Sequence, residues 1–198
     1  MTKTRAIALF VAVAGSLLYL KTIYFSPAKN WENYNQAGLV AYGKKDYAEA
    51  EKQLAAALKE AEKFPLNDSR LNLSLNNLME IYRVQAKYAE AEPYIKRSLE
   101  MAEKIYGPEN PNVAAHLNNL AGNYRDRGMY LEAEPLSKRA LDIWEKAFGR
   151  DNPLVIFALK NYADLLRKMD RDAEAESYEA RLKHGRPTTR GSKGKIDP

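Results

Sequence analysis

The chain has 198 residues and a formal net charge of +5, with two histidines and no cysteine. This composition argues against zinc, iron–sulfur and haem sites, and the ten glycines form no phosphate-binding loop. Carboxylates are frequent, but Glu90, Glu92, Glu132 and Glu134 recur with a sequence repeat, as residues of a solvated helix face do. We therefore expect a protein that is not an enzyme, with no cofactor, metal, small-molecule substrate or nucleic acid among its ligands.

Residues 1–29 predict a signal anchor that spans a membrane. Lys3 and Arg5 precede fifteen uncharged residues, 6–20. Extended to Tyr24, this segment forms a helix of about 28 Å, close to the thickness of the hydrocarbon core. A cleaved signal peptide and a buried helix of a soluble protein remain as alternatives.

Small residues within this segment predict contact with another membrane helix. Ala8, Ala12 and Ser16 lie four apart, so they share one stripe of a helix and allow a second helix to approach closely. The charges before the segment predict a cytoplasmic N-terminus and an extracytoplasmic remainder, which is periplasmic in a bacterial cell. The absence of cysteine fits such an oxidising compartment.

Residues 30–184 predict four units of a 42-residue repeat. Residues 82–93 recur at 124–135, a looser copy begins at 166, and residues 47–51 belong to a fourth. Within a unit, apolar residues spaced by three and four predict two helices, as over 113–124 and 133–144. Such a period is typical of stacked helix pairs that bury their apolar faces against their neighbours. The predicted repeats cover residues 31–64, 68–106, 110–148 and 152–184.

Turn residues mark the ends of these helices. Asn110 is a predicted N-cap followed by Pro111 at the first helical position, and the same pair recurs 42 residues later. Gly128 predicts a helix end in the left-handed conformation. Counted from Tyr88 and Tyr130, Pro93 and Pro135 are predicted near the first turn of the second helices, where proline is tolerated.

The repeat resembles a known family. Small residues at Ala50, Ala91, Ala133 and Ala175 follow tyrosines in three of the four units and resemble the tetratricopeptide repeat. The 42-residue period and the segments 117–121 and 134–141 are similar to the variant found in kinesin light chains and many bacterial proteins. The resemblance implies an all-α, right-handed solenoid of about four helix pairs that binds a protein or peptide.

The resemblance also implies that the first helix of each pair lines the binding surface. Three columns of polar residues follow these helices: Asn35, Asn76, Asn118 and Lys160; Gln36, Asn77, Asn119 and Asn161; and Arg83, Arg125 and Arg167, with Tyr42 in the first unit. Amides both donate and accept, so the asparagines can clamp the backbone of an extended peptide, and the arginines can capture carboxylates. Alternatively, the asparagines bond neighbouring turns, and the arginines pair with Glu80, Asp126 and Asp164.

Residues 185–198 predict a disordered basic tail, which is either a solubilising end or a contact for anionic lipid or an acidic partner. Taken together, the sequence predicts a membrane-anchored interaction module that acts as a scaffold, assembly factor or holding chaperone. The alternative is a permanent accessory subunit of a larger membrane complex.

Overall fold

The computed structural model describes residues 26–184. The predicted membrane segment up to residue 25, including Ala8, Ala12 and Ser16, lies outside the described residues, as does the predicted tail from residue 185. Among residues 26–184, no helix combines the length and the apolar character needed to cross a membrane.

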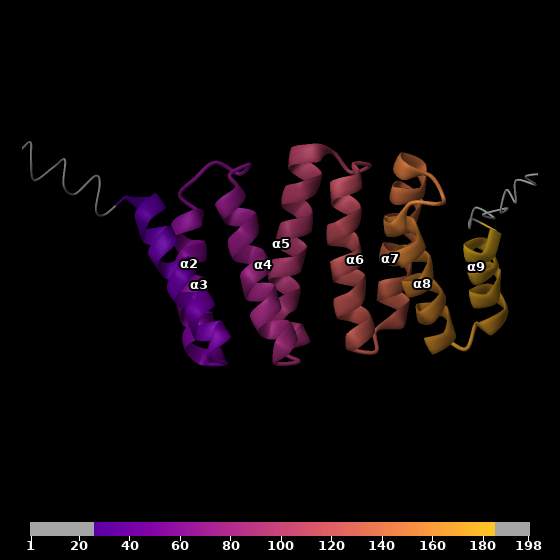
Figure 1. The fold of residues 1–198 in the computed structure, drawn as a ribbon, viewed down its shortest axis with the longest axis horizontal. Coiled ribbons are helices and arrows are strands. Elements are labelled where there is room, and N and C mark those ends of the chain that lie inside the picture. Colours follow the sequence, from indigo (N-terminus) through magenta and orange to yellow (C-terminus); the bar gives the residue numbers. More distant parts are fainter. Residues whose placement is uncertain (1–25, 185–198) are drawn as a thin grey trace, which may run out of the picture. The chain divides into compact units, whose positions relative to one another are not determined.

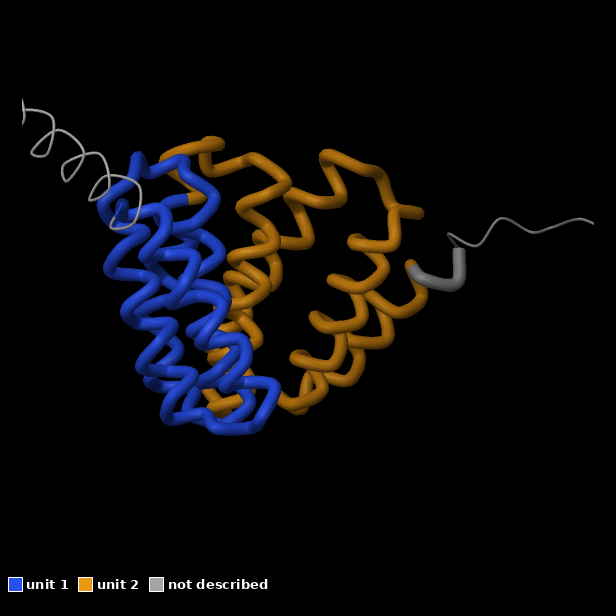
Figure 2. The backbone as a smooth tube through the Cα atoms, turned by 60° about the vertical axis from the view of Figure 1, so that its left-hand side comes forward, with its two compact units in different colours: residues 1–101 blue, residues 102–198 orange. Residues whose placement is uncertain are grey.

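The described residues form eight α-helices (Figure 1). They are α2 (Pro27–Gly43), α3 (Tyr47–Ala61), α4 (Ser69–Val84), α5 (Tyr88–Tyr106), α6 (Pro111–Asp126), α7 (Tyr130–Phe148), α8 (Pro153–Lys168) and α9 (Asp172–His184). The predicted all-α repeat array is confirmed as eight helices. The chain divides into two compact units, residues 1–101 and 102–198, and each is described by itself (Figure 2).

In the first unit, α2 and α3 form a closely packed hairpin on which α4 packs. The fully buried side chains include Leu54 of α3 and Leu75 of α4. A Cβ atom added at Gly38 would lie 2.6 Å from Leu54 Cγ, so only glycine allows α2 to approach α3 this closely. The Trp31 indole donates a 2.8 Å hydrogen bond to Ser74 Oγ and thereby ties α2 to α4.

In the second unit, α6–α9 enclose an apolar core in the same way. Val113, Leu117, Leu141 and Val155 are at most 1% exposed. The Trp144 indole donates a 3.0 Å hydrogen bond to the Pro111 carbonyl and joins α7 to the start of α6. Apolar stripes at helical spacing therefore bury themselves between neighbouring helices, as the sequence predicts.

The predicted helix ends are confirmed at three turns. Asn110 Oδ1 accepts from the Asn112 amide at 2.9 Å with Pro111 behind it, and the equivalent cap precedes α8. Gly128 is left-handed with φ 73°. Equivalent turns use Lys45, Ala86 and Asp170 at φ between 55° and 61°. These were not predicted, because only a few per cent of residues other than glycine have a positive φ.

The prolines of the second helices lie just beyond the first helical turn. Pro93 and Pro135 are the sixth residues of α5 and α7, inside the helix and beyond the first turn. Each removes the amide that would bond the carbonyl four residues earlier. Those carbonyls belong to Ala89 and Leu131, which are exposed, so water can satisfy them. Both helices begin at the tyrosines from which the sequence prediction counts, Tyr88 and Tyr130.

Candidate functional site

The asparagine columns contain hydrogen bonds between neighbouring first helices. In the first unit, Asn77 Nδ2 of α4 donates to Asn35 Oδ1 of α2 at 2.8 Å, and Asn35 is only 8% exposed. In the second unit, Asn161 of α8 donates to Asn118 of α6 at 3.5 Å. Each bond joins the second column on one helix to the first column on the preceding helix. These four residues therefore hold first helices in register within their units.

Other members of the columns are open to a partner. Gln36, Asn119 and Lys160 are exposed, and Asn76 is half-buried. The side chains of Asn76, Asn119 and Lys160 make no hydrogen bond or ion pair with another residue of the described part. They can thus donate to, or accept from, a bound chain without breaking an existing bond.

The arginine column is engaged with acidic neighbours. Arg83 lies 2.7 Å from Glu80, and Tyr42 Oη donates to the same carboxylate at 3.2 Å. The Arg83 guanidinium lowers the pKa of Glu80 against the opposing effect of burial.

The other two arginines also lie near carboxylates. Arg125 is 3.4 Å from Asp126, and Arg167 is 3.9 Å from Asp164 and paired with Glu179 on α9. Carboxylate capture by this column would require these pairs to rearrange.

Exposed apolar residues on the same helices escaped the sequence analysis. Leu73 of α4 is 43% exposed and Phe157 of α8 is 49% exposed, and the two occupy the same repeat position. Leu154, one turn before Phe157, is 44% exposed. An apolar residue on the polar side of an amphipathic helix was the signal available in the sequence. On α8, Phe157 precedes Lys160 by three residues, so the two share one stripe.

The repeated glutamates are not all part of a solvated face. Glu134 accepts hydrogen bonds from Tyr162 Oη at 3.2 Å and Arg171 Nη1 at 2.7 Å, which joins α7 to α8 and its following turn. Glu51, the equivalent residue two repeats earlier, accepts from Tyr82 at 3.0 Å. The expectation of a solvated face is therefore wrong for Glu134, because two neighbouring elements reach its carboxylate.

The second helices carry a set of ion pairs that recurs with the repeat. Arg97, Arg139 and Arg181 are 42 residues apart. They pair with Glu62 directly after α3, Glu103 of α5 and Glu145 of α7 respectively. Arg139 lies 2.8 Å from Glu103 and also donates to the Pro108 carbonyl at 2.8 Å.

No described residues offer the chemistry of a metal centre. Among residues 26–184 no cluster of three or more His, Asp or Glu side chains could hold a metal ion. His116 is half-buried on α6, and its burial lowers its pKa.

A family model described as the tetratricopeptide repeat matches residues 70–134 and 112–182. The chain belongs to the tetratricopeptide repeat family. None of the curated proteins compared with the sequence matches it.

Solved structures share the fold. A Podospora anserina protein described as a kinesin light chain with nearly identical TPR-like repeats is 17% identical with a TM-score of 0.69, over 80% of this chain and 75% of that chain. A single-residue variant of that protein gives the same values. BtubC (BKLC) from P. vanneervenii is 19% identical with a TM-score of 0.65, over 100% of this chain and 78% of that chain. The repeats are thus of the kinesin-light-chain-like kind in fold.

Proposed function

We propose that the protein is a membrane-anchored protein–protein interaction module that binds a partner protein or peptide through its first helices. Tetratricopeptide repeats imply protein partners in general. The module would act as a scaffold, assembly factor or holding chaperone, with its repeats on the extracytoplasmic side. The anchor and this location rest on residues 1–29 of the sequence.

The observation that supports the binding surface most is the exposed stripe of α8. Phe157 is 49% exposed, and Lys160 on the same stripe has no ion-pair partner in the described part. Half-exposed phenylalanine gains free energy when a partner covers it, and an unpaired lysine can bind a carboxylate without breaking an existing pair. The partner chemistry that fits is an apolar side chain next to an acidic one.

A second candidate is a permanent accessory subunit of a membrane complex. The spacing of Ala8, Ala12 and Ser16 supports it, because small residues at that spacing suit contact with another membrane helix. An adaptor exchanges its partner over time, whereas a subunit remains at constant stoichiometry after detergent extraction.

Purification in mild detergent tests the binding surface. We expect Phe157→Ser combined with Lys160→Glu to lower the amount of co-purifying partner at least about tenfold, since each lost contact contributes on the order of 1 kcal/mol. Leu131→Ser is the matched control, because Leu131 is 76% exposed but lies at the start of α7. Equal recovery of the partner with the double variant and the control would reject this surface.

A reporter fusion tests the proposed location. A reporter that matures only outside the cytoplasm, fused after Pro198, is expected to be active. A silent external reporter together with an active cytosolic reporter would reverse the orientation.

A further inference from the structure

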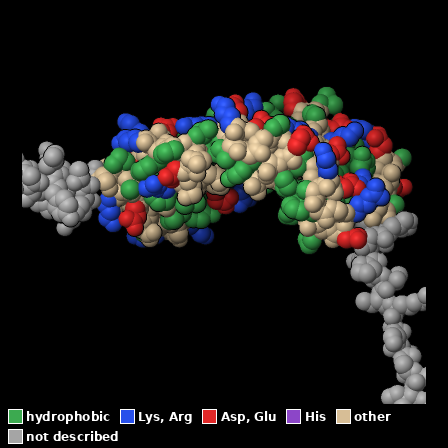
Figure 3. All heavy atoms as spheres, turned by 90° about the horizontal axis from the view of Figure 1, so that it is seen from above, with side chains coloured by type: hydrophobic (Ala, Val, Ile, Leu, Met, Phe, Trp, Pro, Cys, Tyr) green, Lys and Arg blue, Asp and Glu red, His purple; other side chains and the backbone are tan. Residues whose placement is uncertain are grey.

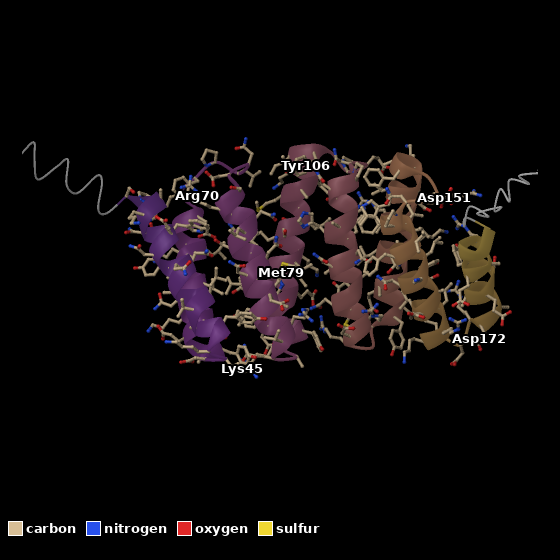
Figure 4. The ribbon with its side chains drawn as sticks, viewed as in Figure 1. Lys45, Arg70, Met79, Tyr106, Asp151 and Asp172 are labelled. Atoms are coloured by element: carbon tan, nitrogen blue, oxygen red, sulfur yellow. The ribbon has the colours of Figure 1, made fainter. Side chains whose placement is uncertain are left out.

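The end of the first unit at which α2 begins carries exposed apolar chain. Figure 4 labels Arg70 at this end and Lys45 at the opposite end of the unit. The α3–α4 connection, residues 62–68, lies at the same end as the start of α2 (Figure 1). It is seven residues long, whereas the corresponding connections before α6 and α8 each have four. Within it, Leu66 is 44% exposed, and Pro65 before it is exposed.

The chain leaves no room for a spacer between the proposed membrane span and this end. The span predicted from sequence reaches Tyr24, and Ser26 already caps α2 by accepting from the Lys29 amide at 3.2 Å. Even fully extended chain from residue 24 to Pro27 covers only about 11 Å. A domain tethered this closely has to present the end that holds Pro27 to the membrane surface.

Three of the basic residues at this end are already paired, whereas Lys59 in the last turn of α3 is exposed. Lys29 lies 2.9 Å from Glu32, Lys63 lies 2.7 Å from Glu60, and Arg70 lies 2.7 Å from Asp68. Arg70 also covers the ring of Phe64, with Cζ 3.6 Å from the ring centroid. Residues 26–32 and 59–70 carry four basic and four acidic side chains, so this end offers an apolar contact with little net charge. At the opposite end the charged side chains of Lys44, Lys45 and Lys87 are exposed, so that end is better solvated by water than by lipid.

We propose that the α3–α4 connection rests in the headgroup region of the bilayer, with Leu66 inserted at the interface. This inference rests on the proposed membrane anchor and adds which end of the first unit faces the lipid. The contact is apolar, so it is independent of lipid charge and of salt. Figure 3 views the chain from this side and shows apolar side chains reaching the surface among charged ones.

Single-cysteine labelling of the full chain tests the inference, because the natural sequence contains no cysteine. An environment-sensitive fluorophore is attached to Leu66→Cys, to Asn67→Cys as a second probe of the connection, and to Val40→Cys as a control. Val40 is 47% exposed, similar to Leu66. It lies fourteen residues beyond Ser26 along α2, about 21 Å from the start of the helix.

The labelled chains are reconstituted into phosphatidylcholine vesicles, with and without phosphatidylglycerol. We expect labels at 66 and 67 to shift to shorter emission wavelength and to be quenched by nitroxide-bearing lipid. The label at 40 keeps its emission in water and is quenched by soluble iodide. Raising the salt to about 1 M, where the screening length is about 3 Å, is expected to change neither result.

Flotation of the same vesicles separates the two proposals. If the chain floats but the labels at 66 and 67 behave as in water, the lipid contact is overturned and the anchor stands. If the chain does not float, both are overturned. A shorter emission wavelength without quenching by lipid means that protein, such as a second copy or the N-terminal segment, covers this end, and this too overturns the lipid contact.

Discussion

At the scale of single residues, the buried asparagine of α2 shows how a polar column can serve packing. Asn35 is 8% exposed and accepts from Asn77 at 2.8 Å. A buried amide is stable only when its polar atoms find partners, so this pair selects one register of α2 against α4. Asn76, the neighbour of Asn77, makes no such bond in the described part and remains accessible.

Replacement of Asn35 is therefore expected to weaken folding. Asn35→Ala leaves Asn77 Nδ2 without its acceptor, and because Asn77 is half-buried, water replaces only part of the bond. We expect a loss of about 1 kcal/mol in the free energy of unfolding, measured by urea denaturation. Asn76→Ala is the control and should change it by less than about 0.5 kcal/mol. Equal effects of the two substitutions would contradict the assigned roles.

At the scale of elements, ion pairs at the repeat period join successive second helices. Arg139 of α7 pairs with Glu103 of α5 and donates to the Pro108 carbonyl in the connection that follows α5. Both side chains of the pair are about one-third exposed, so water screens the charge interaction. The carbonyl bond fixes the position of the connection before α6 and does not depend on a second charge.

Substitutions of the two residues of this pair are expected to lower the free energy of unfolding by different amounts and with different salt dependence. Arg139→Met removes both contacts and should lower the free energy of unfolding by about 1 kcal/mol. Glu103→Gln removes only the charge interaction, so we expect a loss of about 0.5 kcal/mol that disappears at high salt. Urea denaturation of the single and double variants at low and high salt measures the coupling. A coupling energy of zero at low salt would show that the pair contributes nothing.

At the scale of the whole molecule, the excess of positive charge lies outside the described helices. Residues 26–184 contain 24 Lys and Arg against 25 Asp and Glu, so the excess of positive charge belongs to the two terminal segments. Residues 185–198 alone carry a formal charge of +3. The proposed interaction surface and the excess positive charge therefore reside in separate parts of the chain.

Removal of the basic tail tests whether it takes part in folding. Deleting residues 185–198 lowers the formal net charge from +5 to +2. We expect the midpoint of urea unfolding to stay unchanged, because a polar segment without apolar periodicity contributes no packing. Retention on a cation exchanger is expected to decrease. A lower unfolding midpoint would show that the tail contacts the repeats.

Local features of the fold could be predicted from the sequence alone. The helix pairs, the Asn110 cap and the left-handed Gly128 depend on residues close together in the chain, so period and turn chemistry are sufficient to find them. The tyrosine of the repeat also indicates the start of α5 at Tyr88, so the position of Pro93 near the first turn follows by counting along the chain.

The contacts between helices were decided only by the tertiary structure. The sequence placed Asn35 and Asn76 in one column, but packing buries the first and leaves the second accessible. The asparagine bonds and the Arg139–Glu103 pair join residues on separate helices. Their formation depends on how closely neighbouring helices approach and how far each is rotated about its axis. A repeat period identifies equivalent positions, but it does not determine which of them face a neighbouring helix and which face water.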